Sequence, residues 1–349
     1  MIKVGITQGD INGIGWEVII KTFADPTMLE LCTPVIFGSN KTCSYHRKTL
    51  SGVDDFNFTI IRDAEQAQHK KVNLVNIYEE EVAVELGKPT QAGGTYALKS
   101  LEAACDAIQH GKLDVLVTAP INKHNIQSDL FKFPGHTEYL QMRFGQNDSL
   151  MFMCSDNLRV GVVSGHVPLA NVAANITIEK IISKLRIMNQ SLQRDFGIRK
   201  PKIAVLGLNP HAGDNGTIGA EEQSIIIPAI NKLKEENTLV YGPYSADGFF
   251  GSNTYSKFDA VLGMYHDQGL VPFKSLSFNE GVNYTAGLSI IRTSPDHGTA
   301  YDIAGQNKAN ENSFRKAVYM ALDIYRKRSE FDEITADPLK STPMKKERG

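Results

Sequence analysis

Short apolar runs alternate with amphipathic stretches along most of the chain. A short apolar run bounded by turn residues predicts a buried strand, whereas apolar residues three or four positions apart predict a helix with one buried face. Their alternation predicts an α/β protein built on a mostly parallel sheet. Strands are predicted at 2–6, 34–37, 58–61, 73–77, 113–117, 150–154, 159–164, 202–208, 259–262 and 288–291, and helices at 16–24, 95–110, 178–196 and 312–326, from about 139, and between the second and third strands.

Two details of this pattern are more specific. The runs at 150–154 and 159–164 flank a short polar turn, which predicts a hairpin. The residues after 326 are charged and contain proline, and we expect a loose tail there.

Composition restricts the class of protein. The chain has 349 residues, of which 42% are hydrophobic and 22% charged, so it has globular composition and a length that fits two domains. The formal net charge of −2 and the lack of a long basic run argue against a nucleic-acid partner.

The cysteines and the N-terminal residues bear on location. The four cysteines form no CxxC pair, which suits a reducing compartment and argues against a thiolate metal site. The first apolar run is too short for a signal peptide, and no stretch approaches the roughly 20 apolar residues that a membrane helix needs. We therefore expect a cytoplasmic protein that binds no membrane.

Three predicted strands each end in a turn that carries one histidine. His166, His211 and His266 follow the runs at 159–164, 202–208 and 259–262, and the last of these turns is predicted to be a polar loop. Ligands of open α/β sheets lie at the carboxyl ends of strands, and three imidazoles with an open fourth position make a catalytic divalent-metal site. Three unrelated loop histidines are the alternative, but their equivalent positions favour a shared metal site.

Other candidate positions leave two interpretations open. The turn at 7–15 has glycines at 9, 13 and 15, which match neither the dinucleotide fingerprint nor a P-loop, so it is either a ligand loop or a tight turn. His136 and Thr137 either contact a polar substrate or are a surface residue and a helix N-cap. Asp247 either serves the metal or a proton transfer, or is an exposed turn residue.

A set of motifs spread over most of the chain resembles one family. The segment 297–305 is similar to the cofactor loop of the isocitrate and isopropylmalate dehydrogenase superfamily, which wraps the adenosine half of NAD. The other motifs resemble the 4-hydroxythreonine-4-phosphate dehydrogenases of pyridoxal phosphate biosynthesis. They are Pro-Gly-His136-Thr-Glu, Gly-His166-Val-Pro-Leu, Leu-Asn-Pro-His211-Ala-Gly, Tyr-His266-Asp-Gln-Gly-Leu, Gly-Val-Asn283 and Ile-Arg292-Thr-Ser.

The resemblance implies an architecture and a set of site residues. It implies two α/β/α domains with the active site in the cleft between them, one built from 1–128 plus 286–349 and the other from 129–285. It implies a homodimer with shared active sites. The next enzyme of the pathway, to which the product would be transferred, is a further candidate partner. The implied metal ligands are His166, His211 and His266; the substrate contacts are His136, Thr137, Lys274, Asn283 and Arg292; the cofactor contacts are His297, Gly298, Thr299, Ala300, Asp302 and Gly305.

The implied reaction is the NAD-dependent oxidation of 4-phosphooxy-L-threonine to 2-amino-3-oxo-4-phosphooxybutanoate, which decarboxylates to 3-amino-2-oxopropyl phosphate. One divalent metal per site (Zn, Co, Mn or Mg) would stabilise the alkoxide. Asp267, Asp247 and Lys274 are the candidates for proton transfer or for support of the metal ligands.

The sequence leaves several points open. These are the metal, NAD or NADP as cofactor, the identity of the general base, and 4-phospho-threonate or 4-phospho-erythronate as alternative substrates. A zinc hydrolase that uses the three histidines and a bound water is an alternative of a different class.

Overall fold

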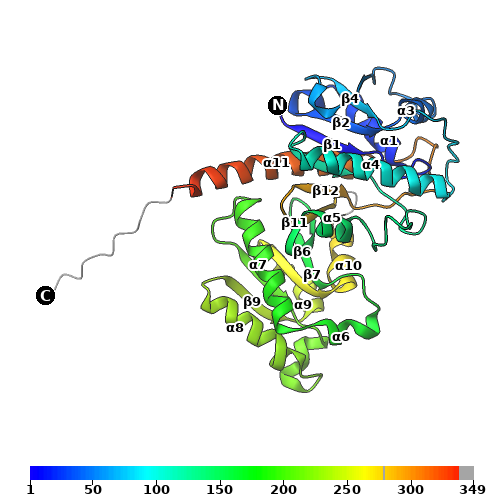
Figure 1. Cartoon of the computed structure of the whole chain (residues 1–349). Coiled ribbons are helices and arrows are strands. Elements are labelled where there is room, and N and C mark those ends of the chain that lie inside the picture. Colours follow the sequence, from blue (N-terminus) through cyan, green and yellow to red (C-terminus); the bar gives the residue numbers. More distant parts are fainter. Residues whose placement is uncertain (278–279, 338–349) are drawn as a thin grey trace.

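A single mixed sheet forms the centre of the computed structural model, which describes residues 1–277 and 280–337. Its strand order is β3-β4-β2-β1-β5-β12-β11-β6-β7-β10-β8-β9. Neighbours pair in parallel except across β12-β11, β11-β6 and β6-β7, so the predicted mostly parallel sheet and the hairpin are both confirmed. Figure 1 shows the two halves of the molecule, with β11 and β12 between them.

The elements follow one another as expected for an α/β chain. The strands are β1 (Lys3–Thr7), β2 (Thr33–Gly38), β3 (Phe58–Ile61), β4 (Val72–Asn76), β5 (Val115–Thr118), β6 (Gly145–Cys154), β7 (Arg159–Ser164), β8 (Lys202–Leu206), β9 (Leu239–Tyr244), β10 (Ala260–Tyr265), β11 (Val282–Leu288) and β12 (Arg292–Pro295). The main helices are α1 (Gly15–Ala24), α3 (Asn40–Arg47), α4 (Gln91–Gln109), α5 (His136–Phe144), α7 (Ile178–Arg194), α8 (Ile227–Glu235), α9 (Ala246–Gly251), α10 (His266–Leu276) and α11 (Asn312–Thr335).

Helices cover both faces of the sheet because alternate strand residues point to opposite sides. On β8, Ile203 and Val205 join a core with α7 and α8, whereas Ala204 and Leu206 join a second core with α9 and α10. In the other half, α1 and α11 cover one face and α4 and α5 cover the other. The predicted α/β/α arrangement is therefore confirmed.

Three predictions of local structure are wrong. The polar loop expected after the run at 259–262 is helix α10, which begins at His266 and contains Pro272. Of the strand expected at 288–291, only Leu288 lies in a strand, as the last residue of β11; residues 289–291 connect β11 to β12, and Arg292 opens β12. Helix α11 continues to Thr335, so the expected tail does not begin at 327; its residues from 338 onward lie outside the described part of the chain.

The division into two domains stays a prediction. The half of the sheet from β3 to β12 comes from residues 3–118 and 292–295, and the half from β11 to β9 comes from 145–288. The proposed boundary at 285/286 lies within β11. In the described part of the chain, no helix combines the length and apolar character needed to cross a bilayer.

Candidate active site

The three strand-end histidines lie at one edge of the sheet. Strand β10 pairs in parallel with β7 on one side and with β8 on the other. His166 follows β7, His266 follows β10 and His211 follows β8. Because parallel neighbours end at the same edge, the sequence pattern correctly predicted that these residues share one end of the sheet.

His166 and His266 lie side by side, with ring centroids 5.8 Å apart. Each ring presents Nδ1 to a carboxylate: Glu138 at 3.1 Å for His166 and Asp267 at 2.7 Å for His266. A carboxylate accepts a hydrogen bond, so these contacts favour the proton on Nδ1 and leave Nε2 for another partner. The hydrogen bond from His166 lowers the pKa of Glu138.

His211 differs from the other two histidines. It lies in segment η3 (Pro210–Gly216), where its φ is 55°, and its side chain is exposed. Within the described residues of one chain, no group of three His, Cys, Asp or Glu side chains converges closely enough to hold a metal ion. The shared site implied by the family resemblance stays a prediction, and in one chain His266 lies beside His166.

A cleft of about 270 Å³ lies between the two halves of the molecule. It brings together all five of the predicted substrate residues, although they come from α5, α10, β11 and β12. Its lining includes His136, Thr137, Lys274, Asn283, Arg292, His166, His297 and Gly298, and also Thr118, Lys123, Glu138 and Asp296.

Arg292 is buried at the base of this cleft, with 2% of its surface exposed. Its guanidinium donates to the hydroxyls of Thr118 (2.6 and 3.1 Å) and Thr285 (3.1 Å), and within the described residues it forms no ion pair with a carboxylate. Burial lowers the pKa of Arg292 to about 10. A buried cation held only by hydroxyls can gain most from an anion that enters the cleft.

Four polar atoms around the cleft are buried and have no hydrogen-bond partner among the described residues. They are His136 Nε2, Glu138 Oε2, Asn283 Oδ1 and His297 Nε2. Buried polar atoms are normally paired, so this group indicates that the cleft binds a polar ligand. Burial, followed by the charges of Arg292 and Lys123, holds the pKa of His136 well below its usual value, so this ring is neutral.

The alternative interpretations of His136 and Thr137 do not fit. Gly135 precedes α5 and no side chain caps that helix, so Thr137 is not the N-cap. Nor is His136 a surface residue, since its Nε2 is buried beside the cleft.

Lys274 reaches the cleft from α10 and forms an ion pair with Asp296 (3.1 Å), at the end of β12. The lysine side chain is 52% exposed and the aspartate 19%. Burial raises the pKa of Asp296, whereas Lys274 lowers it, with burial the larger effect. Lys274 is thus an exposed cation of the cleft and Arg292 a buried one. Lys274 lies on helix α10 instead of the polar loop expected there, and Arg292 opens β12.

The predicted cofactor segment 297–305 packs against the glycine-rich turn after β1. The N–H of Ile14 donates to the carbonyl of Thr299 (3.0 Å), and the Tyr301 hydroxyl donates to Asp10 (2.7 Å). A Cβ on Gly13 would lie 2.7 Å from the Thr299 carbonyl oxygen, so the contact requires glycine. The turn therefore positions the segment, as Figure 1 shows beside α1.

A comparison with known protein families shows to which family the chain belongs. The model of the family described as "Pyridoxal phosphate biosynthetic protein PdxA" matches residues 30–321. The chain belongs to the PdxA family. The resemblance noted in the sequence motifs is thus confirmed.

Individual relatives agree with this assignment. The 4-hydroxythreonine-4-phosphate dehydrogenase of Bacteroides thetaiotaomicron is 54% identical over 97% of this chain and 93% of that protein. A crystal structure of 4-hydroxythreonine-4-phosphate dehydrogenase from Klebsiella pneumoniae is 31% identical, with a TM-score of 0.80 over 93% of this chain and 98% of that one. Isocitrate dehydrogenase from Methylococcus capsulatus, 14% identical with a TM-score of 0.51 over 96% of this chain and 89% of its own, shares the fold.

Membership in the PdxA family makes this chain an oxidoreductase of pyridoxal phosphate biosynthesis, as predicted, and implies a nicotinamide cofactor. The zinc-hydrolase alternative does not fit the family. The roles assigned to individual residues are not tested by the comparisons.

Several predicted residues lie outside the cleft. Asp267 and Asp247 are exposed and accompany His266 and His211, respectively, rather than the substrate residues. Of the predicted cofactor residues, only His297 and Gly298 line the cleft, while Thr299, Ala300, Asp302 and Gly305 follow along the segment.

The sequence reasoning missed Glu138, Asp296, Lys123 and Thr118 as cleft residues. Glu138 follows His136 and Thr137 in the first turn of α5, and Asp296 directly precedes His297. Their place beside predicted site residues was the available signal.

Proposed function

We propose that the chain oxidises 4-phosphooxy-L-threonine with NAD or NADP to 2-amino-3-oxo-4-phosphooxybutanoate, which decarboxylates to 3-amino-2-oxopropyl phosphate. The observation that carries this proposal is Arg292, a buried cation at the base of the cleft that lacks a carboxylate partner among the described residues. The Bacteroides relative is a 4-hydroxythreonine-4-phosphate dehydrogenase, which supports this substrate.

Two of the three cations that line the cleft, Arg292 and Lys274, suit a substrate with two anionic groups, one phosphate and one carboxylate. Arg292 offers a fixed guanidinium, whose hydrogen bonds to Thr118 and Thr285 orient it before the substrate arrives. Lys274 offers a mobile ammonium that an incoming anion can draw away from Asp296. Which cation meets the phosphate is decided by the experiment below.

The unpaired acceptors favour an amino substrate over 4-phospho-threonate and 4-phospho-erythronate. Asn283 Oδ1 and Glu138 Oε2 both line the cleft and have no partner in the described part of the chain. An ammonium group carries three donors where a hydroxyl carries one, so it satisfies these acceptors more completely.

We propose that His166, His211 and His266 hold one divalent metal, in sites shared between the two chains of a homodimer. The donor set fits: at His166 and His266 a carboxylate engages Nδ1 and leaves Nε2 for a metal. When bound, the metal would supply Lewis-acid stabilisation of negative charge on the substrate oxygen. Zinc, cobalt, manganese and magnesium are the candidates.

The remaining roles concern side chains of this protein. The segment 297–305 would hold the nicotinamide cofactor, with His297 and Gly298 nearest to the substrate. Neutral His136 would orient the substrate through Nε2 without adding charge beside Arg292. Lys274, Asp267 and Asp247 remain the candidates for proton transfer. The four cysteines are buried free thiols, which suits the cytoplasmic location that we propose.

The test is NADH formation with phosphorylated and unphosphorylated forms of each candidate substrate, with and without chelator. We expect the phosphorylated amino acid to be preferred, and loss of phosphate to reduce kcat/KM at least ~100-fold. Chelation should abolish turnover, and added metal should restore it. Full activity of chelator-treated enzyme would reject the metal proposal, and a faster reaction with a phosphorylated hydroxy acid would reject the amino substrate.

The variant Arg292→Met then shows whether Arg292 or Lys274 binds the phosphate of the substrate. If Arg292 meets the phosphate, the variant is slow with both forms and the ratio of their kcat/KM values falls towards one. If the ratio is unchanged in Arg292→Met and falls in Lys274→Met, the lysine meets the phosphate.

A further inference from the structure

The turn that carries His211 has an unusual backbone. Five consecutive residues lie in the left-handed region, with φ of 55° at His211, 52° at Ala212, 78° at Gly213, 41° at Asp214 and 55° at Asn215. Only one of the five is glycine; Asp and Asn adopt the left-handed conformation occasionally, but as single residues and not in a run of this length. Such a turn persists only where the surrounding structure enforces it.

Glu222 is placed to enforce this turn. It is 1% exposed and opens the π-helix η4 (Glu222–Ile226). Its Oε1 accepts the backbone N–H groups of Leu208 (2.7 Å) and Asn209 (2.7 Å), and its Oε2 accepts Asn209 Nδ2 (3.0 Å). The carboxylate thus fixes the backbone at the point where it leaves β8 for the turn.

The turn closes directly over this carboxylate. A Cβ on Gly213 would lie 2.5 Å from Glu222 Oε2, so the glycine permits the approach. No cation pairs with Glu222 in the described part of the chain; instead of a counter-ion it has the backbone N–H groups and Asn209. A buried carboxylate without a counter-ion is costly, which makes a role in holding the turn the best account of this residue.

We propose that Glu222 is a positioning residue that presents His211 to the metal. It contacts neither the substrate cleft nor His211 itself, and it acts through the backbone of 208–209 and the approach of Gly213. The inference rests on the proposed metal site.

The test measures zinc affinity of the full-length, metal-stripped protein by competition with a chromophoric chelator. Glu222→Gln keeps the size of the side chain but turns an amide NH₂ towards either the backbone N–H groups or Asn209 Nδ2, so donors face donors. Loss of a group that orients a metal ligand typically weakens binding 10- to 100-fold, and we expect a weakening of about that size. The absorption spectrum of the cobalt-loaded variant should change as well.

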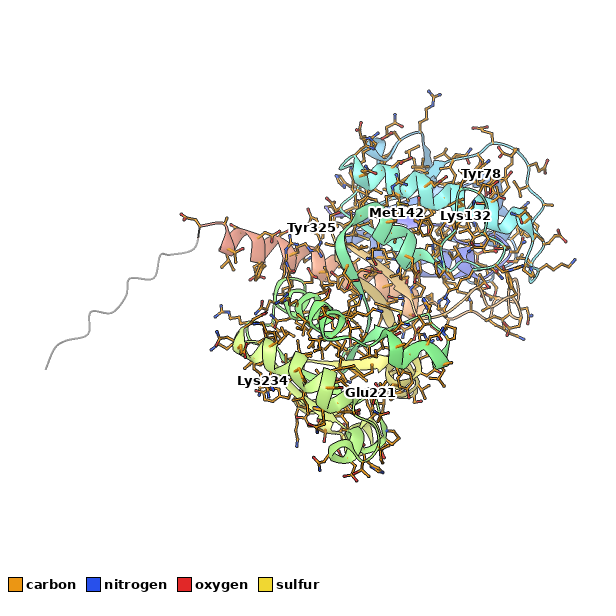
Figure 2. The ribbon with its side chains drawn as sticks, turned by 60° about the horizontal axis from the view of Figure 1, so that its bottom comes forward. Tyr78, Lys132, Met142, Glu221, Lys234 and Tyr325 are labelled. Carbon is orange, nitrogen blue, oxygen red and sulfur yellow. The ribbon has the colours of Figure 1, made fainter. Side chains whose placement is uncertain are left out.

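Two controls separate positioning from general effects. Glu221→Gln removes the neighbouring carboxylate, which accepts from Asn209 Nδ2 (2.8 Å) but not from the backbone of 208–209 among the hydrogen bonds of the described residues, and should bind zinc as the wild type does. Glu221 is labelled in Figure 2, on the surface at the end of the molecule away from Tyr78. Leu233→Ala opens a cavity in the buried face of α8; it should lower the thermal midpoint and leave zinc affinity unchanged.

The outcomes distinguish this inference from the proposed function. If His211→Ala weakens zinc binding and folded Glu222→Gln does not, the positioning role is overturned and the metal site stands. If His211→Ala binds zinc as the wild type does, the metal site fails and this inference fails with it. Should Glu222→Gln not fold, Gly213→Ala decides, since its Cβ displaces the same carboxylate; it too must weaken zinc binding, and normal affinity would overturn the inference.

Discussion

The imidazole of His46 is 1% exposed, and its Nε2 lies 2.7 Å from the carbonyl oxygen of Ile11, in the turn that supports the cofactor segment. Burial lowers the pKa of His46 to about 4, although the hydrogen bond to Ile11 opposes this change. The folded protein therefore keeps this ring neutral at pH values where the unfolded chain protonates it.

The sign of the pH dependence follows. Because the folded pKa lies below the unfolded value of 6.5, stability is fully present above pH 6.5 and is lost as the pH falls towards 4, by about 1.4 kcal/mol per unit. In His46→Gln, an amide can keep the hydrogen bond without titrating. Between pH 7.5 and 5.5 the wild type should lose about 1 kcal/mol more unfolding free energy than the variant, measured with urea. Parallel pH profiles for the two proteins would contradict the argument.

The sequence predicted which residues form the site better than it predicted how buried those residues are and what they contact. The strand-end positions of His166, His211 and His266 were readable because a strand and the turn after it are local features. The burial of His136 and Arg292 was not, since it depends on tertiary contacts. Arg292, for example, donates to Thr118 and Thr285, and Thr118 is far from it in the sequence. The support of the His211 turn by Glu222 was hidden for the same reason.

At the scale of elements, two predictions were wrong because helix-breaking residues and an apolar run were interpreted without their tertiary contacts. Gly269 and Pro272 suggested a loop after β10, yet both lie inside α10, where Gly269 packs against Val160. The apolar run at 288–291 suggested a strand, but β11 already ends at Leu288, one residue after Gly287 with its φ of 87°, and the chain reverses before Arg292. Tertiary packing therefore overrode local signals at both places.

Helix α11 is longer than predicted because its final turns bind the other half of the molecule. Near its start, Thr293 of β12 donates to the carbonyl of Ala317 (2.7 Å). Further along, Arg328 donates to Asp195 (2.9 Å), at the end of α7, and to the hydroxyl of buried Tyr284 on β11 (3.0 Å). The helix thus connects both halves of the sheet, as Figure 1 shows.

Removing one partner of this buried ion pair should destabilise the protein strongly. In the pair, Arg328 is 12% exposed and Asp195 5%. Arg328→Met leaves a buried carboxylate without its cation, and we expect a loss of about 3–5 kcal/mol in urea unfolding. Arg326→Met, which breaks an exposed pair with Asp323, is the control and should change stability by less than about 1 kcal/mol.

The double variant Asp195→Asn with Arg328→Met completes the test. It removes both charges, so it should be more stable than Arg328→Met alone. Asp195→Asn is measured alone as well. If the stability lost in the double variant equals the sum of the losses in the two single variants, the two residues do not couple and the connection depends on apolar packing instead.

At the scale of the whole molecule, the sequence predicted the layers because alternating strands and helices leave few alternatives, whereas the cleft was implied by the family resemblance. It could not predict how copies of the chain associate, since that depends on surface shape. For the shared sites we propose that His166 and His211 come from one chain and His266 from its partner, as in the family that the sequence resembles. The contact between His166 and His266 in one chain suggests a second arrangement, in which His211 is the residue supplied by the partner.

Mixtures of inactive variants separate these arrangements. Each of His166→Ala, His211→Ala and His266→Ala is dissociated, mixed with one of the others and reassociated, and mass spectrometry confirms that mixed dimers form. Where two lesions affect ligands from different chains, one site of a mixed dimer collects both and the other is intact. About half of the dimers are mixed and half of their sites are whole, so roughly a quarter of wild-type activity should return.

The pattern of recovery identifies the ligand set. Our proposal predicts recovery when His266→Ala is mixed with either of the other variants, and none when His166→Ala is mixed with His211→Ala. If His211 is the residue from the partner, the two mixtures that contain His211→Ala recover and the mixture of His166→Ala with His266→Ala stays inactive. If all three ligands belong to one chain, each lesion stays with its own site and no mixture recovers. Wild-type protein carried through the same dissociation sets the scale, so a failure to reassemble cannot be mistaken for the third result.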